Sequence, residues 1–303
     1  MRVFVTGGTG LVGRRLIQDL DRRGDAVVCV TRDPLRARGR LPGAVELVGA
    51  DPNLAGGWQD RLATCDAVVN LAGESVGGGR WTAARKRRIR RSRLAVTDHV
   101  AAAVAAADRP LTLVSASAVG YYGDGGERAL GEDAQPGQDF LAHLAVEWEN
   151  TARNAEREGA RVVLLRIAMV LARDGGALPV MLRPFRLGLG GPLGGGRQYQ
   201  PWIHLEDLVA AILFALDTPA LAGPVNASVP NPPTQAAFAR ALGRALGKPA
   251  VLPAPAFALR LLLGEQADLV LNGQRVLPNA LRARGFKFRF PELDAALTDV
   301  LGR

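Results

Sequence analysis

A glycine-rich segment near the start of the chain has the residue types and spacing of a dinucleotide-binding turn. Val3 to Val5 has the β-branched and aromatic composition of a buried strand, and Thr6 to Gly13 (TGGTGLVG) follows it directly. A helical pattern then runs through Leu16, Ile17 and Leu20. Strand, glycine loop and helix in this order direct backbone N–H groups and a helix N-terminus at a pyrophosphate. We favour this interpretation over a glycine turn with a purely structural role.

The three spaced glycines of this segment have separate roles. Gly7 permits the tight turn, Gly10 lets the backbone approach the pyrophosphate, and Gly13 lets the helix pack closely on the strand. The residues expected to contact the cofactor here are Gly7, Thr9, Gly10, Leu11, Val12 and Gly13.

The end of the second predicted strand decides between NAD and NADP. A carboxylate at this point would bind the ribose 2′-OH of NAD, whereas an arginine accommodates the 2′-phosphate of NADP. The strand Ala26 to Thr31 is followed by Arg32, whose guanidinium can bind a phosphate with two hydrogen bonds. Asp33 lies one residue further on, before Pro34, where a turn or helix cap is the alternative. We therefore expect NADP rather than NAD.

Strand and helix patterns alternate through the first half of the chain. The predicted strands are Arg2 to Thr6, Ala26 to Thr31, Val45 to Val48, Ala67 to Leu71, Leu111 to Ser115 and Val162 to Arg166. The main helices between them are Arg14 to Arg22, Ala83 to Ala107 and Phe140 to Glu158. This order predicts an α/β fold, a Rossmann-type doubly wound parallel sheet with a smaller, mainly helical C-terminal substrate domain.

The two domains are expected to exchange segments. Residues 1–170 with about 204–228 would form the NADP-binding domain, and about 171–203 with 229–303 the smaller one. The ligand cleft is expected between them, at the carboxyl ends of the strands.

Composition limits the class of protein. The chain has 303 residues and a net charge of +9, carried almost entirely by arginine, which favours an anionic ligand. No apolar run is long enough to span a bilayer, so we expect no membrane contact. Cys29 and Cys65 have no metal-type spacing, which predicts reduced thiols in the cytoplasm and no metal site.

Further motifs extend along the whole chain. Asn70 to Gly73 (NLAG), Ser115 to Gly123 (SASAVGYYG), Trp148-Glu149, Trp202 to Asp207 (WIHLED) and Leu271 to Pro278 (LNGQRVLP) accompany the glycine loop. Together they resemble the extended short-chain dehydrogenase/reductase superfamily, and within it the atypical "epimerase family protein" group. The resemblance implies a small-molecule substrate handled by an oxidoreductase or epimerase-like enzyme.

Site residues follow from these motifs. The small-residue turn Leu71, Ala72 and Gly73 is expected beside the cofactor. The resemblance adds Ser115 and Arg166 at its border, although a domain-interface salt bridge is an equal alternative for Arg166. For catalysis the candidates are Ser117, Tyr121 and Tyr122, and the alternative for both tyrosines is to line the pocket.

The usual catalytic helix has lost its reactive pair. The superfamily uses a tyrosine as acid/base and a lysine four residues later that lowers the tyrosine pKa. The corresponding helix, from Asp139 to Glu149, contains neither residue, and Phe140 and Leu141 occupy the tyrosine region. His143 is the only nearby proton-transfer candidate, and a solvent-facing position is the favoured alternative.

Two further segments have competing interpretations. The glycine-rich loop Gly194 to Trp202 is either a lid or a connector. We expect Trp202 and His204 to line the substrate pocket. The alternative for His204 is a supporting role at the domain junction. The run Arg85 to Arg93 could neutralise nucleic-acid phosphates. It lacks interleaved aromatic residues, which favours a solvated helix face without nucleic acid.

Two functions from different classes remain open. The first is an NADP-binding oxidoreductase or epimerase-like enzyme acting on an unidentified small molecule. The alternative is a non-catalytic NADP-binding protein that senses redox state or docks a partner. Loss of the tyrosine and lysine counts against standard epimerase chemistry, which needs both.

Overall fold

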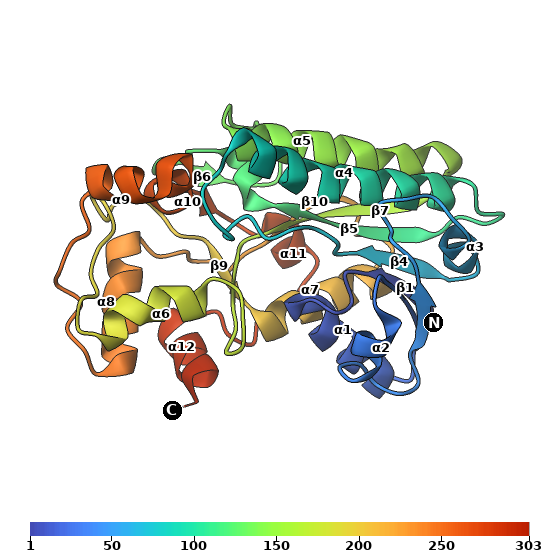
Figure 1. Ribbon diagram of the computed structural model, residues 1–303, viewed down its shortest axis with the longest axis horizontal. Helices are drawn as coiled ribbons and strands as arrows, with labels where there is room; N and C mark the ends of the chain where they lie inside the picture. Colours follow the sequence, from blue (N-terminus) through green and yellow to red (C-terminus); the bar gives the residue numbers. More distant parts are fainter. Residues whose placement is uncertain (303) are drawn as a thin grey trace.

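The computed structural model describes residues 1–302, apart from the side chains of residues 157 and 158, and is built around one seven-stranded sheet (Figure 1). In spatial order the strands are β10 (Gly223–Ala227), β7 (Arg161–Ile167), β5 (Thr112–Ala118), β4 (Ala67–Asn70), β1 (Arg2–Thr6), β2 (Ala26–Thr31) and β3 (Glu46–Gly49). All neighbours pair in parallel. The predicted Rossmann-type doubly wound sheet is confirmed. Its strand order reverses between β1 and β4, where such sheets bind ligands.

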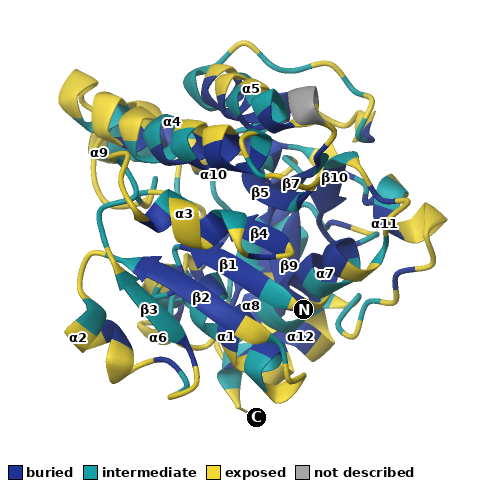
Figure 2. Ribbon diagram, turned by 90° about the vertical axis from the view of Figure 1, so that its right-hand side faces the viewer, coloured by how far each residue is buried: buried dark blue, intermediate teal, exposed yellow. Residues whose placement is uncertain are grey.

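Helices cover both faces of the sheet. Figure 1 shows α4 (Ala83–Ala105) and α5 (Phe140–Arg153) on one face, and α1 (Leu11–Arg22) and α7 (Leu205–Asp217) on the other. Successive strand residues point to opposite faces, so Phe4 packs in the α4 layer while its neighbours pack in the α1 and α7 layer. The central strands are therefore buried on both sides (Figure 2).

The C-terminal region is mainly helical and has its own apolar core. This core joins α6 (Leu178–Arg186), α8 (Gln235–Leu246) and α12 (Leu293–Leu301) to a two-stranded sheet. The two strands are β8 (Met169–Leu171) and β9 (Trp202–His204). Phe238 and Trp202 are its largest fully buried side chains. Burial of these rings gives the region a hydrophobic interior separate from that of the main sheet.

Short elements complete the fold. The helices are α2 (Pro34–Arg38), α3 (Trp58–Ala63), α9 (Ala256–Leu263), α10 (Asp268–Leu271) and α11 (Asn279–Ala283). The 3-10 turns are η1 (Val119–Tyr122), η2 (Asn154–Glu158) and η3 (Gly264–Ala267), and β6 (Ala129–Leu130) pairs with β11 (Arg275–Val276). Leu281 of α11 and Phe286 pack into the core of the main sheet, although the sequence prediction assigned them to the smaller domain.

Local capping explains where several helices begin. Thr82 accepts a hydrogen bond from the Arg85 N–H at the start of α4, and Asp139 accepts one from Ala142 at the start of α5. The helix predicted from Phe140 to Glu158 is α5 followed by η2. Within the described residues, no helix combines the length and apolar character needed to cross a bilayer.

Candidate functional site

The glycine loop has little room for any side chain. Gly7 has φ +68°, and a Cβ there would lie 2.8 Å from the Leu71 carbonyl carbon and oxygen. A Cβ on Gly13 would lie 2.3 Å from the Gly7 carbonyl oxygen. The Gly10 N–H donates to that same oxygen over 3.0 Å, which closes the turn. Only glycine fits at Gly7 and Gly13, as the dinucleotide interpretation requires.

The first turn of α1 is open to an anion. Its N-cap, Gly10, has an extended backbone and no side chain that could accept from the N–H groups of the turn. Leu11 and Val12 are half-buried at its start, and Thr9 precedes them in the loop. Uncapped N–H groups and the helix dipole together favour a bound phosphate. The residues present therefore fit the pyrophosphate of a dinucleotide.

A buried polar network holds the second loop against the first. Asn70 at the end of β4 accepts from the Thr6 hydroxyl over 2.7 Å and donates to Thr97 over 2.8 Å and to Ser115 over 3.3 Å. The Thr6 hydroxyl in turn accepts from the Ala72 N–H over 3.2 Å. These contacts fix the Leu71 to Gly73 turn beside Gly7. Ser115 is fully buried in this network, so it supports the predicted cofactor-binding turn through Asn70.

The position that selects between cofactors is exposed. Arg32 follows β2, its side chain is exposed, and within residues 1–302 it has no ion-pair partner. Asp33 has a different role, because its carboxylate accepts from the Arg36 N–H over 2.9 Å and caps α2. The guanidinium of Arg32 is free to bind a 2′-phosphate, and the Asp33 carboxylate is not free to bind a ribose 2′-OH. The end of β2 therefore fits NADP better than NAD.

Three of the predicted site residues instead form a closed, buried network beneath the carboxyl ends of β5 and β7. Arg166 donates to both carboxylate oxygens of Glu149, each over 2.8 Å, and the Ser117 hydroxyl donates to the same carboxylate over 2.7 Å. Arg166 also donates to the Tyr122 hydroxyl over 2.9 Å, and that hydroxyl donates to Asn226 over 2.7 Å. The hydroxyls of Ser117 and Tyr122 and the guanidinium of Arg166 thus all form hydrogen bonds within the protein.

This network changes the interpretation of Tyr122 and Arg166. Burial raises the pKa of Tyr122 to about 12, with Arg166 opposing the rise, so its phenol stays protonated at neutral pH. The charge of Arg166 is balanced by Glu149, whose side chain is as deeply buried. These contacts argue against proton transfer by Tyr122 and against cofactor binding by Arg166. Arg166 does form a salt bridge, but its partner Glu149 belongs to the same predicted domain, so the pair does not cross the domain interface.

Tyr121 is the predicted catalytic residue that remains available. It is half-buried, its ring lies under the Arg166 guanidinium at 3.5 Å, and the Tyr122 ring meets it edge-on. Among the described residues its hydroxyl has no hydrogen-bond partner. His143, on the exposed side of α5, occupies the solvent-facing position favoured by the sequence.

The lost tyrosine position has a packing role. Leu141 of α5 contacts Gly120 of η1, where a Cβ would lie 3.2 Å from the leucine Cβ. The helix and the turn that carries Tyr121 therefore pack closely, with apolar residues where the family pair is expected. The sequence analysis gave Glu149 no role of its own. The Trp148-Glu149 motif was the one signal that marked this residue.

Both predicted substrate-pocket residues are buried at the junction with the C-terminal region. Trp202 is fully buried, and its indole N–H lacks a partner in the described part of the chain. His204 caps α7, lies 3.2 Å from an Asp299 carboxylate oxygen, and has its pKa lowered by burial. It borders a cavity of about 510 Å³ beside α1 that Leu11 and Arg173 also line. The junction alternative for His204 thus agrees with its contacts.

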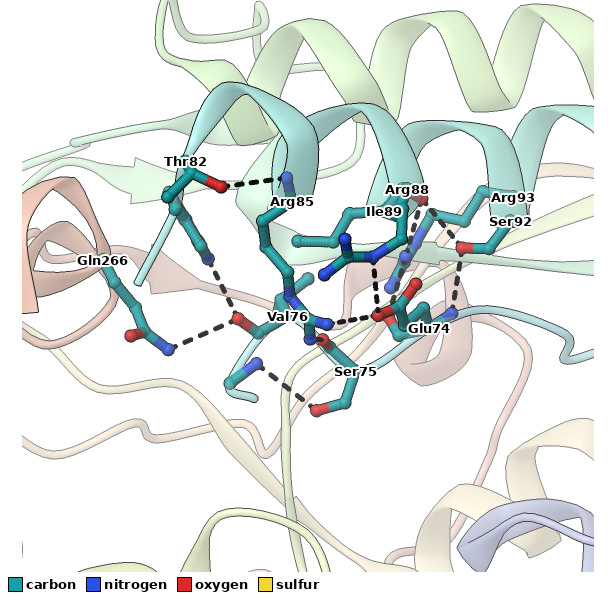
Figure 3. A network of polar contacts seen from close by, with 12 residues as sticks. Glu74, Ser75, Val76, Thr82, Arg85, Arg88, Ile89, Ser92, Arg93 and Gln266 are labelled. Carbon is teal, nitrogen blue, oxygen red and sulfur yellow. Dashed lines mark hydrogen bonds and ion pairs between the residues drawn. The ribbon is translucent and has the colours of Figure 1, made fainter. Parts of the chain in front are cut away.

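The basic run of α4 serves internal contacts. Glu74 pairs with Arg85, and its backbone N–H donates to Ser92 over 3.0 Å (Figure 3). Arg93 donates to the Glu74 carbonyl over 3.0 Å and lies beside Gly73; burial lowers its pKa to about 10. These contacts fix the segment after the Leu71 to Gly73 turn. The run is therefore only partly the solvated face that the sequence suggested.

Across residues 1–302, no cluster of three or more His, Cys, Asp or Glu side chains is arranged to hold an ion.

Comparisons with known proteins agree with this geometry. Residues 3–227 match the model of the NAD dependent epimerase/dehydratase family, and residues 254–300 match a domain of unknown function. The chain is 41% identical over 304 residues to the chloroplastic "Epimerase family protein SDR39U1 homolog" of Arabidopsis thaliana, covering 99% of this chain and 87% of that protein. It is also 41% identical over 307 residues to epimerase family protein SDR39U1 of Bos taurus, covering 99% and 100%.

A solved structure shows the same fold in a bound state. The human epimerase family protein SDR39U1, crystallised with NADPH, superposes with a TM-score of 0.87 at 37% identity, and the match covers all of both chains.

Proposed function

We propose that this chain, which belongs to the NAD dependent epimerase/dehydratase family, binds NADPH at its glycine loop and acts as an oxidoreductase on a small molecule. The observation that carries the proposal is the loop itself, where Gly7 and Gly13 admit no Cβ and the first turn of α1 is uncapped. The NADPH of the human relative and the free guanidinium of Arg32 support NADPH over NADH.

The cofactor would supply a hydride for a substrate carbonyl. The protein would supply the accompanying proton, and Tyr121 is the candidate because its hydroxyl is uncommitted while that of Tyr122 is buried. Ser117 is bound to Glu149, so it would position the network rather than contact the substrate. Standard sugar epimerisation is disfavoured, since α5 holds no tyrosine and lysine pair.

The cellular setting belongs to the same proposal. Cys29 and Cys65 are free and buried, and burial raises the pKa of Cys29 to about 11. Unpaired, protonated thiols suit a reducing cytoplasm.

A second candidate is a non-catalytic NADPH-binding protein. It is favoured by the internal commitment of Ser117 and Tyr122, which leaves Tyr121 as the only predicted catalytic residue with a free hydroxyl. One experiment separates the two functions: NADPH oxidation is followed at 340 nm across a panel of aldehydes, ketones and sugar nucleotides. Turnover of any substrate that falls at least tenfold in Tyr121→Phe supports the enzyme. NADPH binding without turnover across the panel supports the binding protein.

A further inference from the structure

One end of the molecule exposes an apolar surface that the proposed function does not use. We call it the α9 face, and its members are Leu187, Leu189, Val251, Leu252, Phe257, Leu261 and Leu262. Their exposed fractions run from 48% to 78%. The helix α9 within it has no buried residue at all. Contiguous exposed apolar residues mark an interaction surface.

Backbone contacts hold its two segments together. The Leu252 N–H donates to Gly190 over 3.1 Å, and the Ala254 N–H donates to Pro192 over 2.8 Å. The segments that precede Gly190 and α9 therefore lie side by side, along the end of the molecule where Figure 1 shows α6, α8 and α9. Phe257 and Leu261 are four residues apart, so they lie on one side of α9.

Cations without partners border the apolar residues. Arg183 and Arg186 precede Leu187, and Lys248 precedes Val251; in residues 1–302 none of the three pairs with a carboxylate. Arg186 and Lys248 together line a cavity of about 210 Å³, whose other walls are Leu246 and Leu301. A cavity with two cations and apolar walls fits a phosphate attached to an apolar chain.

Nearby carboxylates do not offset this charge. Glu265 pairs with Lys86, and Asp268 pairs with Arg260. The rim of the α9 face is therefore positive, and a complementary surface would be negative. The face also has no Trp or Tyr, the aromatic residues typical of protein hot spots.

From these observations we propose that the α9 face docks the protein on an anionic phospholipid bilayer. Phe257, Leu261 and their neighbours enter the interface, and a lipid phosphate sits between Arg186 and Lys248. The helix has eight residues, too few to span a bilayer, so docking at this face is peripheral. The expectation of no membrane contact rested on the lack of a spanning segment, which peripheral docking does not require.

Sedimentation of the full chain with vesicles tests the proposal. We expect binding to vesicles of phosphatidylcholine with phosphatidylglycerol, weakening with salt, and at least tenfold less binding to phosphatidylcholine alone. Arg186→Glu with Lys248→Glu should lower binding about 30-fold or more. Phe257→Ser with Leu261→Ser should lower it about tenfold or more.

Matched controls carry the same changes elsewhere. Arg282→Glu with Arg284→Glu alters the charge equally on exposed residues at the end of α11, and Leu35→Ser with Leu54→Ser alters two other exposed leucines. Both controls should bind like the unchanged chain, with circular dichroism confirming that every variant is folded. Equal loss in the controls, or no sedimentation with either vesicle, overturns the proposal. A dimer in solution that Phe257→Ser with Leu261→Ser disperses also overturns it, because the face would then belong to a second copy.

Discussion

The two edges of the predicted cleft are built in different ways. At the β1 and β4 edge, close backbone packing at Gly7 and Gly13 leaves N–H groups free for a ligand. At the β5 and β7 edge, Glu149 and Arg166 form a buried ion pair, and both also bind neighbouring side chains. The first edge is thus a binding site open to a cofactor, whereas the second is a support whose charges are already satisfied. The fold can therefore keep its cofactor site while the tyrosine and lysine that usually carry out catalysis are replaced.

The largest effect is expected at the second edge. Glu149→Ala would leave the Arg166 guanidinium buried without its partner, which should lower the free energy of unfolding by about 3–5 kcal/mol. Urea denaturation measures this change. Glu147 lies on the same helix as Glu149, and Glu147→Ala breaks its exposed pair with Arg90 of α4, which should cost about 1 kcal/mol or less. Similar costs for both variants would show that the buried network does not stabilise this edge.

A smaller loss is expected at the first edge. Asn70→Ala removes hydrogen bonds to Thr6, Thr97 and Ser115 and should lower the free energy of unfolding by about 2–3 kcal/mol. It should also weaken NADPH binding, because the Leu71 to Gly73 turn loses its anchor. Asn53→Ala, which breaks a partly exposed contact with Asp51, is the control and should change neither quantity appreciably. Unchanged NADPH affinity in Asn70→Ala would show that this network does not support the cofactor site.

The two tyrosines should differ although they are neighbours. Tyr122→Phe removes the hydroxyl that joins Arg166 to Asn226, so the free energy of unfolding should fall by about 1–2 kcal/mol. Tyr121→Phe should change it by less than about 0.5 kcal/mol, because that hydroxyl has no partner in the described residues. A larger stability loss in Tyr121→Phe than in Tyr122→Phe would reverse the assignment of the two residues.

The smallest effect concerns pH. Burial lowers the pKa of His204 in the folded state below its ordinary 6.5, so the unfolded chain binds the proton more readily. The stability that His204 contributes is therefore full above about pH 6.5 and falls as the pH drops below it. His204→Gln should flatten this part of the stability profile, measured as the midpoint of urea unfolding from pH 8 to 5. A steeper acid loss in the variant would mean that Asp299 instead raises the His204 pKa.

How much the sequence predicted also differs between the two edges. The glycine loop and the strands β1 and β2 are local patterns. The bounds of both strands agree with the structure to the residue, while α1 begins at Leu11, three residues before the predicted helix. The Glu149 and Arg166 pair depends on α5 crossing β7 at one register, and no local spacing encodes that contact. Short elements such as α3 and β6 were missed because a few residues carry too little periodicity. The exposure of Tyr121 against the burial of Tyr122 likewise depends on the fold of η1.

Calorimetric titration with NADPH and NADH tests the central claim most directly. The unchanged chain should bind NADPH more tightly than NADH, and Arg32→Asp should weaken NADPH about 10- to 100-fold while NADH changes little. Arg282→Asp, an exposed arginine on α11, should leave both affinities unchanged. Equal weakening of both cofactors by Arg32→Asp, or no binding of either to the unchanged chain, would contradict an NADPH site at the glycine loop.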